Sequence, residues 1–196
     1  MPATIPAPEH VMRPQLQRPI HRPLALTLTA LLAFACLAAA PRPQPVPNPN
    51  PKPEATVVYV VRHAEKAADS GRDPELSPAG AARAERLAAM LADASIAAVF
   101  VTPTTRSRDT GSPVAQGADV QLTPYNPFDN DELVRLIRDR HAGDAVLVVA
   151  HSNTVAPIVH ALGGPKDADL AEDEYTRLYA IILNDTGAAR TLRLRF

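Results

Sequence analysis

The stretch Thr56-Val-Val-Tyr-Val-Val61 is a continuous run of β-branched and apolar residues, and Arg62-His63 follows it directly. A short apolar run of this kind predicts a strand that is buried on both faces, as in a parallel sheet. Two later runs have the same character, Ile96–Val101 and Ala145–Val149. The chain is therefore predicted to build its core on at least three buried strands.

Segments with helical signals lie between these strands. Ser77 followed by Pro78 is a helix start, and Asp129 or Asn130 can cap a helix that ends before Gly143. Helices are predicted at residues 79–92, 105–115 and 153–162, and one more begins at residue 129 or 130 and ends before 143. Further strands are predicted at 120–122, 176–184 and 189–195. A turn at 185–187 joins the last two strands. Alternating strands and helices predict a three-layer α/β/α sandwich around a mostly parallel, doubly wound sheet with antiparallel C-terminal strands.

Residues 1–40 have the layout of a secretory signal. Three arginines precede the segment Leu24–Ala40, which carries no charge and ends in small residues. A basic start followed by an apolar run is typical of exported proteins. A buried core helix and an uncleaved membrane anchor are the alternatives, because the run is at the lower limit of length for crossing a bilayer. The prediction is an extracytoplasmic protein of the periplasm or cell envelope.

Cys36 is the only cysteine of the chain, so no internal disulfide is possible. Its setting, Leu32-Ala-Phe-Ala-Cys36, resembles the lipobox of bacterial lipoproteins, whose cysteine carries the lipid; one more apolar residue of the signal is the other interpretation. Proline alternates with other residues from Pro41 to Pro53, which predicts an extended linker over residues 41–55. The linker would join a membrane tether to a folded domain of residues 56–196.

The charge balance narrows the choice of partners. The net charge is -1 and the sequence pI is about 6.6, which gives no indication of nucleic-acid binding. Any attraction for an anionic ligand must then arise at a local site and not from the whole surface.

Polar and charged residues follow three of the predicted strands. Ligands of such sheets bind at the carboxyl ends of the strands. The segments are Arg62-His63, Thr102 through Arg106, and His151-Ser152-Asn153. Taken singly, each residue has an ordinary structural explanation, but together two arginines and two histidines suit an oxyanion such as phosphate. A helix that begins near Asn153 would add backbone donors. No carboxylate cluster of metal-ligand type accompanies them, so neither a metal nor a cofactor is predicted.

The ordered motifs resemble those of the histidine phosphatase superfamily, in its small single-domain branch of phosphoglycerate mutase-like fold. The matching segments are Val60–Lys66, Leu76–Gly80, Thr102–Thr110 and Val148–Thr154. The resemblance implies that His63 attacks phosphorus and forms a phosphohistidine, which water then hydrolyses. It further implies that the phosphate oxygens are held by Arg62, Arg106, His151, Ser152 and Asn153.

The chain departs from the family pattern at several positions. Ala64 replaces a frequent glycine, Thr102–Ser107 is a loose version of Ser-Pro-Leu-x-Arg-Ala, and the chain has no Trp. The missing Trp argues against mutase activity. For the general acid that protonates the leaving group, Asp131 is the candidate, Glu65 is the alternative, and helix capping explains the acidic residues near Asp131 equally well.

The sequence therefore predicts a metal-independent phosphomonoesterase that acts on phosphorylated small molecules or phosphoproteins. A phosphohistidine-protein phosphatase and a catalytically inactive, tethered phosphate-binding module are the alternatives. The loops at the predicted site are short, which leaves little material for a lid. An open, shallow site of that kind suits phosphoproteins or bulky envelope phosphates.

Overall fold

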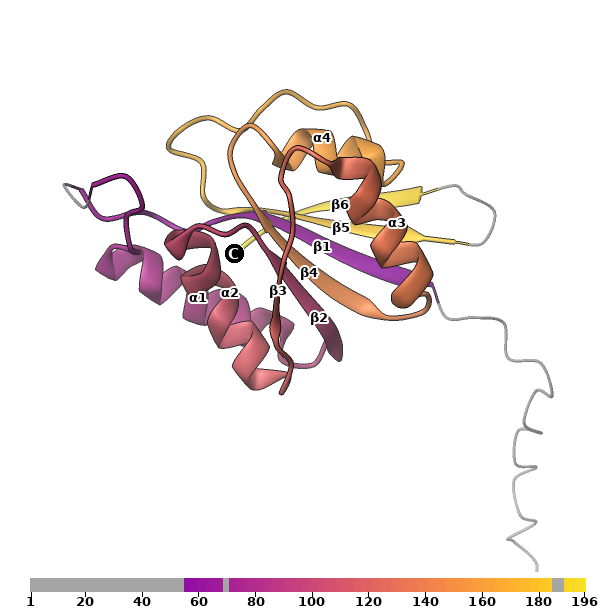
Figure 1. Ribbon diagram of the computed structural model, residues 1–196, viewed down its shortest axis with the longest axis horizontal. Helices are drawn as coiled ribbons and strands as arrows, with labels where there is room; N and C mark the ends of the chain where they lie inside the picture. Colours follow the sequence, from indigo (N-terminus) through magenta and orange to yellow (C-terminus); the bar gives the residue numbers. More distant parts are fainter. Residues whose placement is uncertain (1–54, 69–70, 185–188) are drawn as a thin grey trace, which may run out of the picture. The chain divides into compact units, whose positions relative to one another are not determined.

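The computed structural model describes residues 55–68, 71–184 and 189–196 (Figure 1). The predicted signal at 1–40, with Cys36, lies outside the described residues, as do nearly all of the linker and the turn at 185–187. Within the described part, no helix is long and apolar enough to cross a membrane.

The described strands form one mixed sheet in the order β3-β2-β4-β1-β5-β6. Pairing is parallel from β3 through β1 and antiparallel where β5 joins β1 and where β6 joins β5. The strands are β1 (Thr56–Arg62), β2 (Ile96–Val101), β3 (Leu122–Pro124), β4 (Ala145–Ala150), β5 (Arg177–Leu183) and β6 (Ala189–Arg195). The α/β class, the mostly parallel sheet and its antiparallel C-terminal strands are confirmed.

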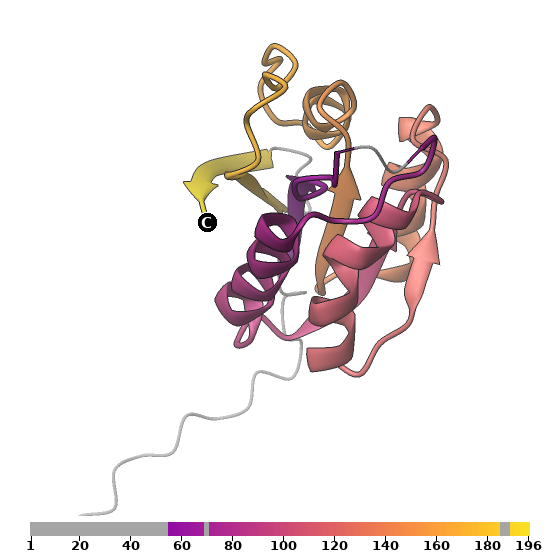
Figure 2. The ribbon, with the colours of Figure 1, turned by 90° about the vertical axis from the view of Figure 1, so that its left-hand side faces the viewer.

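Helices cover both faces of this sheet (Figures 1 and 2). They are α1 (Pro78–Leu91), α2 (Thr105–Gly117), α3 (Asn130–Arg140) and α4 (Val155–Ala161). Leu87 of α1 and Val114 of α2 belong to one buried apolar cluster, and Ile137 of α3 and Ile158 of α4 belong to the other. The central strands supply both clusters, which is why their sequences are apolar without alternation.

Local chemistry explains the helix boundaries. The Ser77 hydroxyl accepts from the Gly80 backbone N–H at 3.1 Å, and Pro78 occupies the first turn, as the sequence predicts. Helix α2 continues through Gly111 because this residue packs on β2: a Cβ there would lie 2.9 Å from Cγ1 of Val101. Asp129 caps α3 by accepting from the Glu132 N–H at 3.0 Å.

Two elements begin two residues later than their patterns predict. The third strand starts at Leu122 and not at Val120, because Val120 still donates its N–H to the Ala115 carbonyl at the end of α2, at 3.0 Å. Asp119, with a φ of 55°, makes the turn between them. Helix α4 starts at Val155 and not at residue 153, because Thr154 is its N-cap.

Candidate active site

The carboxyl ends of β1, β2 and β4 meet at one edge of the sheet and line an open pocket of about 430 Å³. Neighbouring parallel strands end at the same edge, so residues far apart in the sequence converge there. The pocket is lined by Arg62, His63, Lys66, Thr102, Pro103, Thr104, Arg106, Pro127, Phe128, His151, Ser152, Asn153 and Glu172.

His63 is held in one tautomer. Its Nδ1 lies 2.8 Å from the carbonyl oxygen of Ala64, and a carbonyl can only accept, so Nδ1 carries the proton. Nε2 is then the basic nitrogen, and it accepts from Nε of Arg106 at 3.2 Å. Only 4% of the residue is exposed. The ring therefore presents a lone pair at a nitrogen that already lies beside an arginine.

Burial keeps this ring uncharged. Desolvation lowers the pKa of His63 to about 3, and the positive charge of Arg106 and the proximity of His151 act in the same direction, against the opposing hydrogen bond to the Ala64 carbonyl. At neutral pH His63 is neutral. A neutral imidazole with an unprotonated Nε2 is the form that can attack phosphorus.

The residue after His63 is tied to helix α2. The Ala64 N–H donates to Oγ1 of Thr110 at 2.9 Å, and that hydroxyl donates to the Arg106 carbonyl at 2.7 Å. Ala64 is fully buried, so its methyl group is accommodated in place of the frequent glycine. The carbonyl that orients the imidazole is thereby fixed relative to the arginine that faces it.

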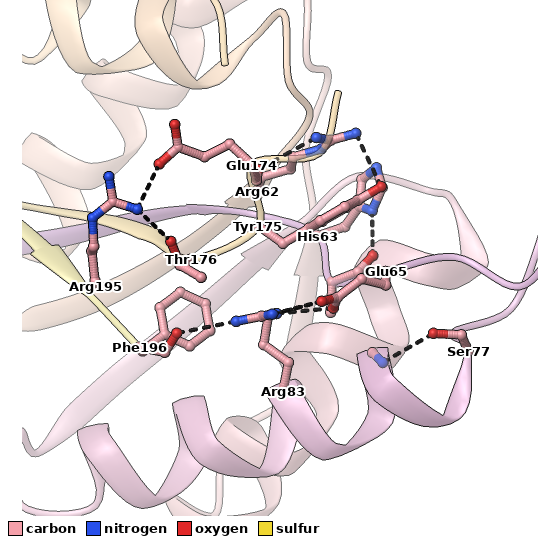
Figure 3. Close-up of polar contacts among 12 residues, drawn as sticks. Arg62, His63, Glu65, Ser77, Arg83, Glu174, Tyr175, Thr176, Arg195 and Phe196 are labelled. Atoms are coloured by element: carbon pink, nitrogen blue, oxygen red, sulfur yellow. Dashed lines mark hydrogen bonds and ion pairs between the residues drawn. The ribbon is translucent and has the colours of Figure 1, made fainter. Parts of the chain in front are cut away.

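Arg62 is buried, and most of its donors are already used within the protein. Its Nη1 donates to the carbonyls of Ala171 and Glu172, each at 2.9 Å, and its guanidinium lies 4.1 Å from the centre of the Tyr175 ring. Nε is buried and has no hydrogen-bond partner among the described residues. The structure thus places Arg62 at the pocket as an anchor for the segment 171–175, with Nε as its unused donor. Figure 3 shows its contacts with Glu174 and Tyr175.

Arg106 and His151 also line the pocket. Arg106 projects from the first turn of α2 and also lies 3.7 Å from a carboxylate oxygen of Asp73. The His151 ring is 5.2 Å from the His63 ring, edge to face. Burial, followed by the charges of Arg106 and Arg62, lowers the pKa of His151 to about 4. A bound phosphate dianion would offset these charges and favour protonated His151.

Neither acid expected from the sequence lines the pocket. Asp131 is exposed in the first turn of α3. Glu65 is paired with Arg83 of α1 through contacts of 2.6 to 3.0 Å (Figure 3), and the hydrogen bonds from Arg83 hold its pKa below the usual value. These contacts leave Glu65 ionised and turned toward α1, which does not suit a proton donor.

Glu172 is the carboxylate that lines the pocket, and the sequence analysis did not single it out. Its side chain is 84% exposed and lies 3.2 Å from Nη2 of Arg62. It also accepts from the hydroxyl of Ser152 at 3.3 Å. Lys66, likewise missed, lines the same pocket with Ser152 and Asn153. In the sequence, Glu172 is marked only by its place among several acidic residues without helical or strand periodicity. Lys66 is the last residue of the motif Val60–Lys66.

A family model described as the histidine phosphatase superfamily (branch 1) matches residues 58–128. Over this range the chain is similar to the histidine phosphatase superfamily. The matched range contains His63 and Arg106, and the fold places His151 beside them. The family and its phosphatase neighbours support a phosphatase.

Solved structures share this fold. The protein histidine phosphatase SixA complexed with tungstate is 19% identical, with a TM-score of 0.58 over 71% of this chain and 96% of that one. A putative phosphohistidine phosphatase SixA from Agrobacterium tumefaciens is 23% identical, with a TM-score of 0.54 over 72% and 99%. A putative alpha-ribazole-5'-P phosphatase from Escherichia coli is 15% identical, with a TM-score of 0.57 over 73% and 97%. No curated protein matches the chain.

The described residues hold no group of three or more His, Cys, Asp or Glu side chains that could bind a metal ion. The cationic groups of the pocket are protein side chains, and one of them, Arg106, donates to the basic nitrogen of His63. Such an arrangement can bind a phosphoryl group and present a nitrogen nucleophile to it.

Proposed function

We propose that this protein hydrolyses phosphate monoesters without a metal ion, through a covalent phosphohistidine on His63. The observation that carries the proposal is the state of the imidazole. His63 is buried and neutral, its Nδ1–H donates to the Ala64 carbonyl, and its Nε2 lone pair faces the pocket beside Arg106.

The first half of the reaction forms the phosphoenzyme. The Nε2 lone pair attacks phosphorus, the bond from phosphorus to the ester oxygen breaks, and the leaving oxygen takes that electron pair. Arg106 transfers its Nε hydrogen bond from His63 to a phosphate oxygen as the substrate enters. The Ala64 carbonyl, 2.8 Å from Nδ1, stabilises the positive charge that develops on the ring.

The second half returns the free enzyme. Water attacks the phosphohistidine, the bond from phosphorus to Nε2 breaks, and inorganic phosphate leaves with the oxygen of that water. Arg106 and His151 are the donors that stabilise charge on the phosphoryl oxygens in both steps, and Arg62 adds its positive charge beside them. Because a loose phosphoryl transition state needs chiefly positioning and charge stabilisation, these side chains can replace a metal ion.

A phosphohistidine-protein phosphatase is the second candidate, and the position of the acids favours it. Asp131 and Glu65 lie away from the pocket, and Glu172 accepts from Arg62. A phosphoramidate whose leaving nitrogen is already protonated needs no enzymic acid, whereas an alkyl ester does. Substrates with good leaving groups are therefore expected to react faster than alkyl phosphates.

The cellular location of the protein is proposed from the sequence. The basic and apolar order of residues 1–40 supports export, and the setting of Cys36 supports a lipid tether. Cell fractionation and labelling with a radioactive fatty acid test this, with Cys36→Ala as the control. Retention of the chain in the cytoplasm would contradict export, and an unlabelled envelope protein would contradict the tether.

Phosphate release by the purified chain from an aryl phosphate tests the proposed function. Activity is expected to persist in excess chelator and to fall by at least about a thousandfold in His63→Ala, since the covalent route is lost. His160→Ala is the matched control, because His160 is exposed on α4 away from the pocket. Full activity in His63→Ala would refute the mechanism, while faster turnover of a phosphohistidine peptide than of every ester would favour the second candidate.

A further inference from the structure

The pocket that His63 and Arg106 line is called the phosphate pocket. A second hollow, of about 390 Å³, adjoins it. Pro103 and Pro127 line both, so the two hollows share a wall. The second one is bounded by Tyr125 and by Leu133 and Leu136 of α3. Its size is that of a small-molecule site, and such sites are usually lined by apolar side chains.

Tyr125 contributes an apolar surface here although it is a tyrosine. The residue is 9% exposed, and its hydroxyl donates to the Val149 carbonyl at 3.3 Å. Its polar end is thus already bonded to the core. What remains for a ligand is the ring, together with proline and leucine side chains.

Phe128 lies next to the wall that the two hollows share. It lines the phosphate pocket, directly follows the shared Pro127, and is 84% exposed, the highest value among the exposed large apolar side chains of the described residues. An aromatic side chain left in water at the mouth of a site is stabilised when an apolar group covers it. This is an independent sign that the ligand extends from the phosphate toward the second hollow.

The charged side chains of the two hollows indicate which end of the ligand lies in each. The phosphate pocket is lined by three cationic side chains and one carboxylate, namely Arg62, Lys66, Arg106 and Glu172. The second hollow is lined by the two carboxylates of Asp129 and Glu132 and by no cationic side chain of the described residues. A phosphate is attracted to the first and repelled by the second. A ligand that fills both therefore carries its negative charge at one end only.

We infer that the second hollow is the leaving-group subsite, and that the substrate is a phosphate ester of an apolar, ring-sized alcohol or phenol that is neutral or cationic. The inference rests on the proposed function. The phosphoryl group lies against His63, the leaving group passes between Pro103 and Phe128, and its apolar part contacts Tyr125 and Leu136.

Phenyl phosphate and 2-naphthyl phosphate test the subsite in the full chain, because their leaving groups have similar basicity and differ in apolar area. The ratio of kcat/KM for naphthyl over phenyl is expected to be about ten, from the apolar contact of one added ring. Phe128→Ala and Leu136→Ala are each expected to lower this ratio at least about threefold. Leu192→Ala is the matched control, since Leu192 is an exposed leucine of β6 that lines neither hollow.

A naphthyl to phenyl ratio near one in the wild type would overturn the inference, as would a ratio that neither Phe128→Ala nor Leu136→Ala lowers. A para-aminomethyl phenyl phosphate is expected to react several-fold faster than its para-carboxymethyl counterpart. Glu132→Gln is expected to reduce this difference in rate. Faster reaction of the carboxymethyl ester would contradict the assigned charge preference. Loss of the proposed function gives a different result, namely phosphate release from neither ester or release that survives in His63→Ala.

Discussion

The buried neutral state of His63 predicts a measurable dependence of stability on pH. The pKa of this side chain is lowered from its ordinary value of 6.5 to about 3 in the folded protein, chiefly by burial. As the pH falls below about 6.5, the unfolded chain takes up a proton that the folded chain does not, so the free energy of unfolding decreases. The decrease continues until the pH approaches the pKa of the folded state. Above about 6.5 neither state binds the proton, and this contribution vanishes.

The size of the effect follows from the pKa values. Between about pH 7 and about pH 4.5 the unfolded side chain titrates over about two pH units while the folded one stays neutral. At about 1.4 kcal/mol per unit, His63 alone lowers the free energy of unfolding by about 2–3 kcal/mol over this range. The asparagine of His63→Asn does not titrate. The wild-type protein should thus lose about 2–3 kcal/mol more than this variant on acidification.

Urea unfolding followed by circular dichroism, at both pH values and for both proteins, measures the difference. Other groups, such as His151 with its pKa of about 4, contribute to the wild type and the variant alike. The comparison therefore isolates His63. Losses on acidification that agree within about 0.5 kcal/mol would refute the conclusion that His63 is neutral because it is buried.

Three further substitutions have definite expectations. Glu172→Gln removes a negative charge beside Arg62, so KM for a dianionic ester should fall a few-fold while kcat changes less. A loss of kcat above about a hundredfold would instead make Glu172 the general acid. Gly80→Ala places a Cβ against the Glu65 carbonyl oxygen, too close for an ordinary contact, and a loss of at least about 2 kcal/mol in the free energy of unfolding by urea is expected. Unchanged stability would show that the close approach is dispensable. Thr110→Val leaves a buried N–H of the loop after β1 without its acceptor and should cost about 1–3 kcal/mol by the same measurement, with no loss contradicting the role of that hydroxyl.

The sequence predicts the sheet well because its central strands are buried on both faces. Thr56–Val61 and Ile96–Val101 have no alternation that could be misread, and each is bounded by a polar signature. The rule that ligands bind at the carboxyl ends of parallel strands then brings His63, Arg106 and His151 into one pocket, as the structure places them. Local pattern and topology were sufficient for this part of the site.

The remaining features depend on contacts between distant segments. Glu65 is adjacent to the motif, yet it turns toward Arg83, 18 residues away, and this pairing has no local signature. Arg62 donates to the carbonyl of Glu172, 110 residues away, through a segment that has neither helical nor strand periodicity. The acidic residues near Asp131 include the cap of α3 at Asp129. Residue type alone could not separate these structural uses of a carboxylate from a catalytic one.

The central claim is that His63 carries the phosphoryl group during turnover. Rapid quenching of the enzyme with an aryl phosphate, followed by mass spectrometry of the proteolytic peptides under alkaline conditions, tests it directly because phosphohistidine survives there. We expect one phosphoryl group on the His63 peptide, attached at Nε2, appearing within the first turnover and absent in His63→Asn. A turning-over enzyme whose phosphate never appears on that peptide, or appears on another residue, would contradict it.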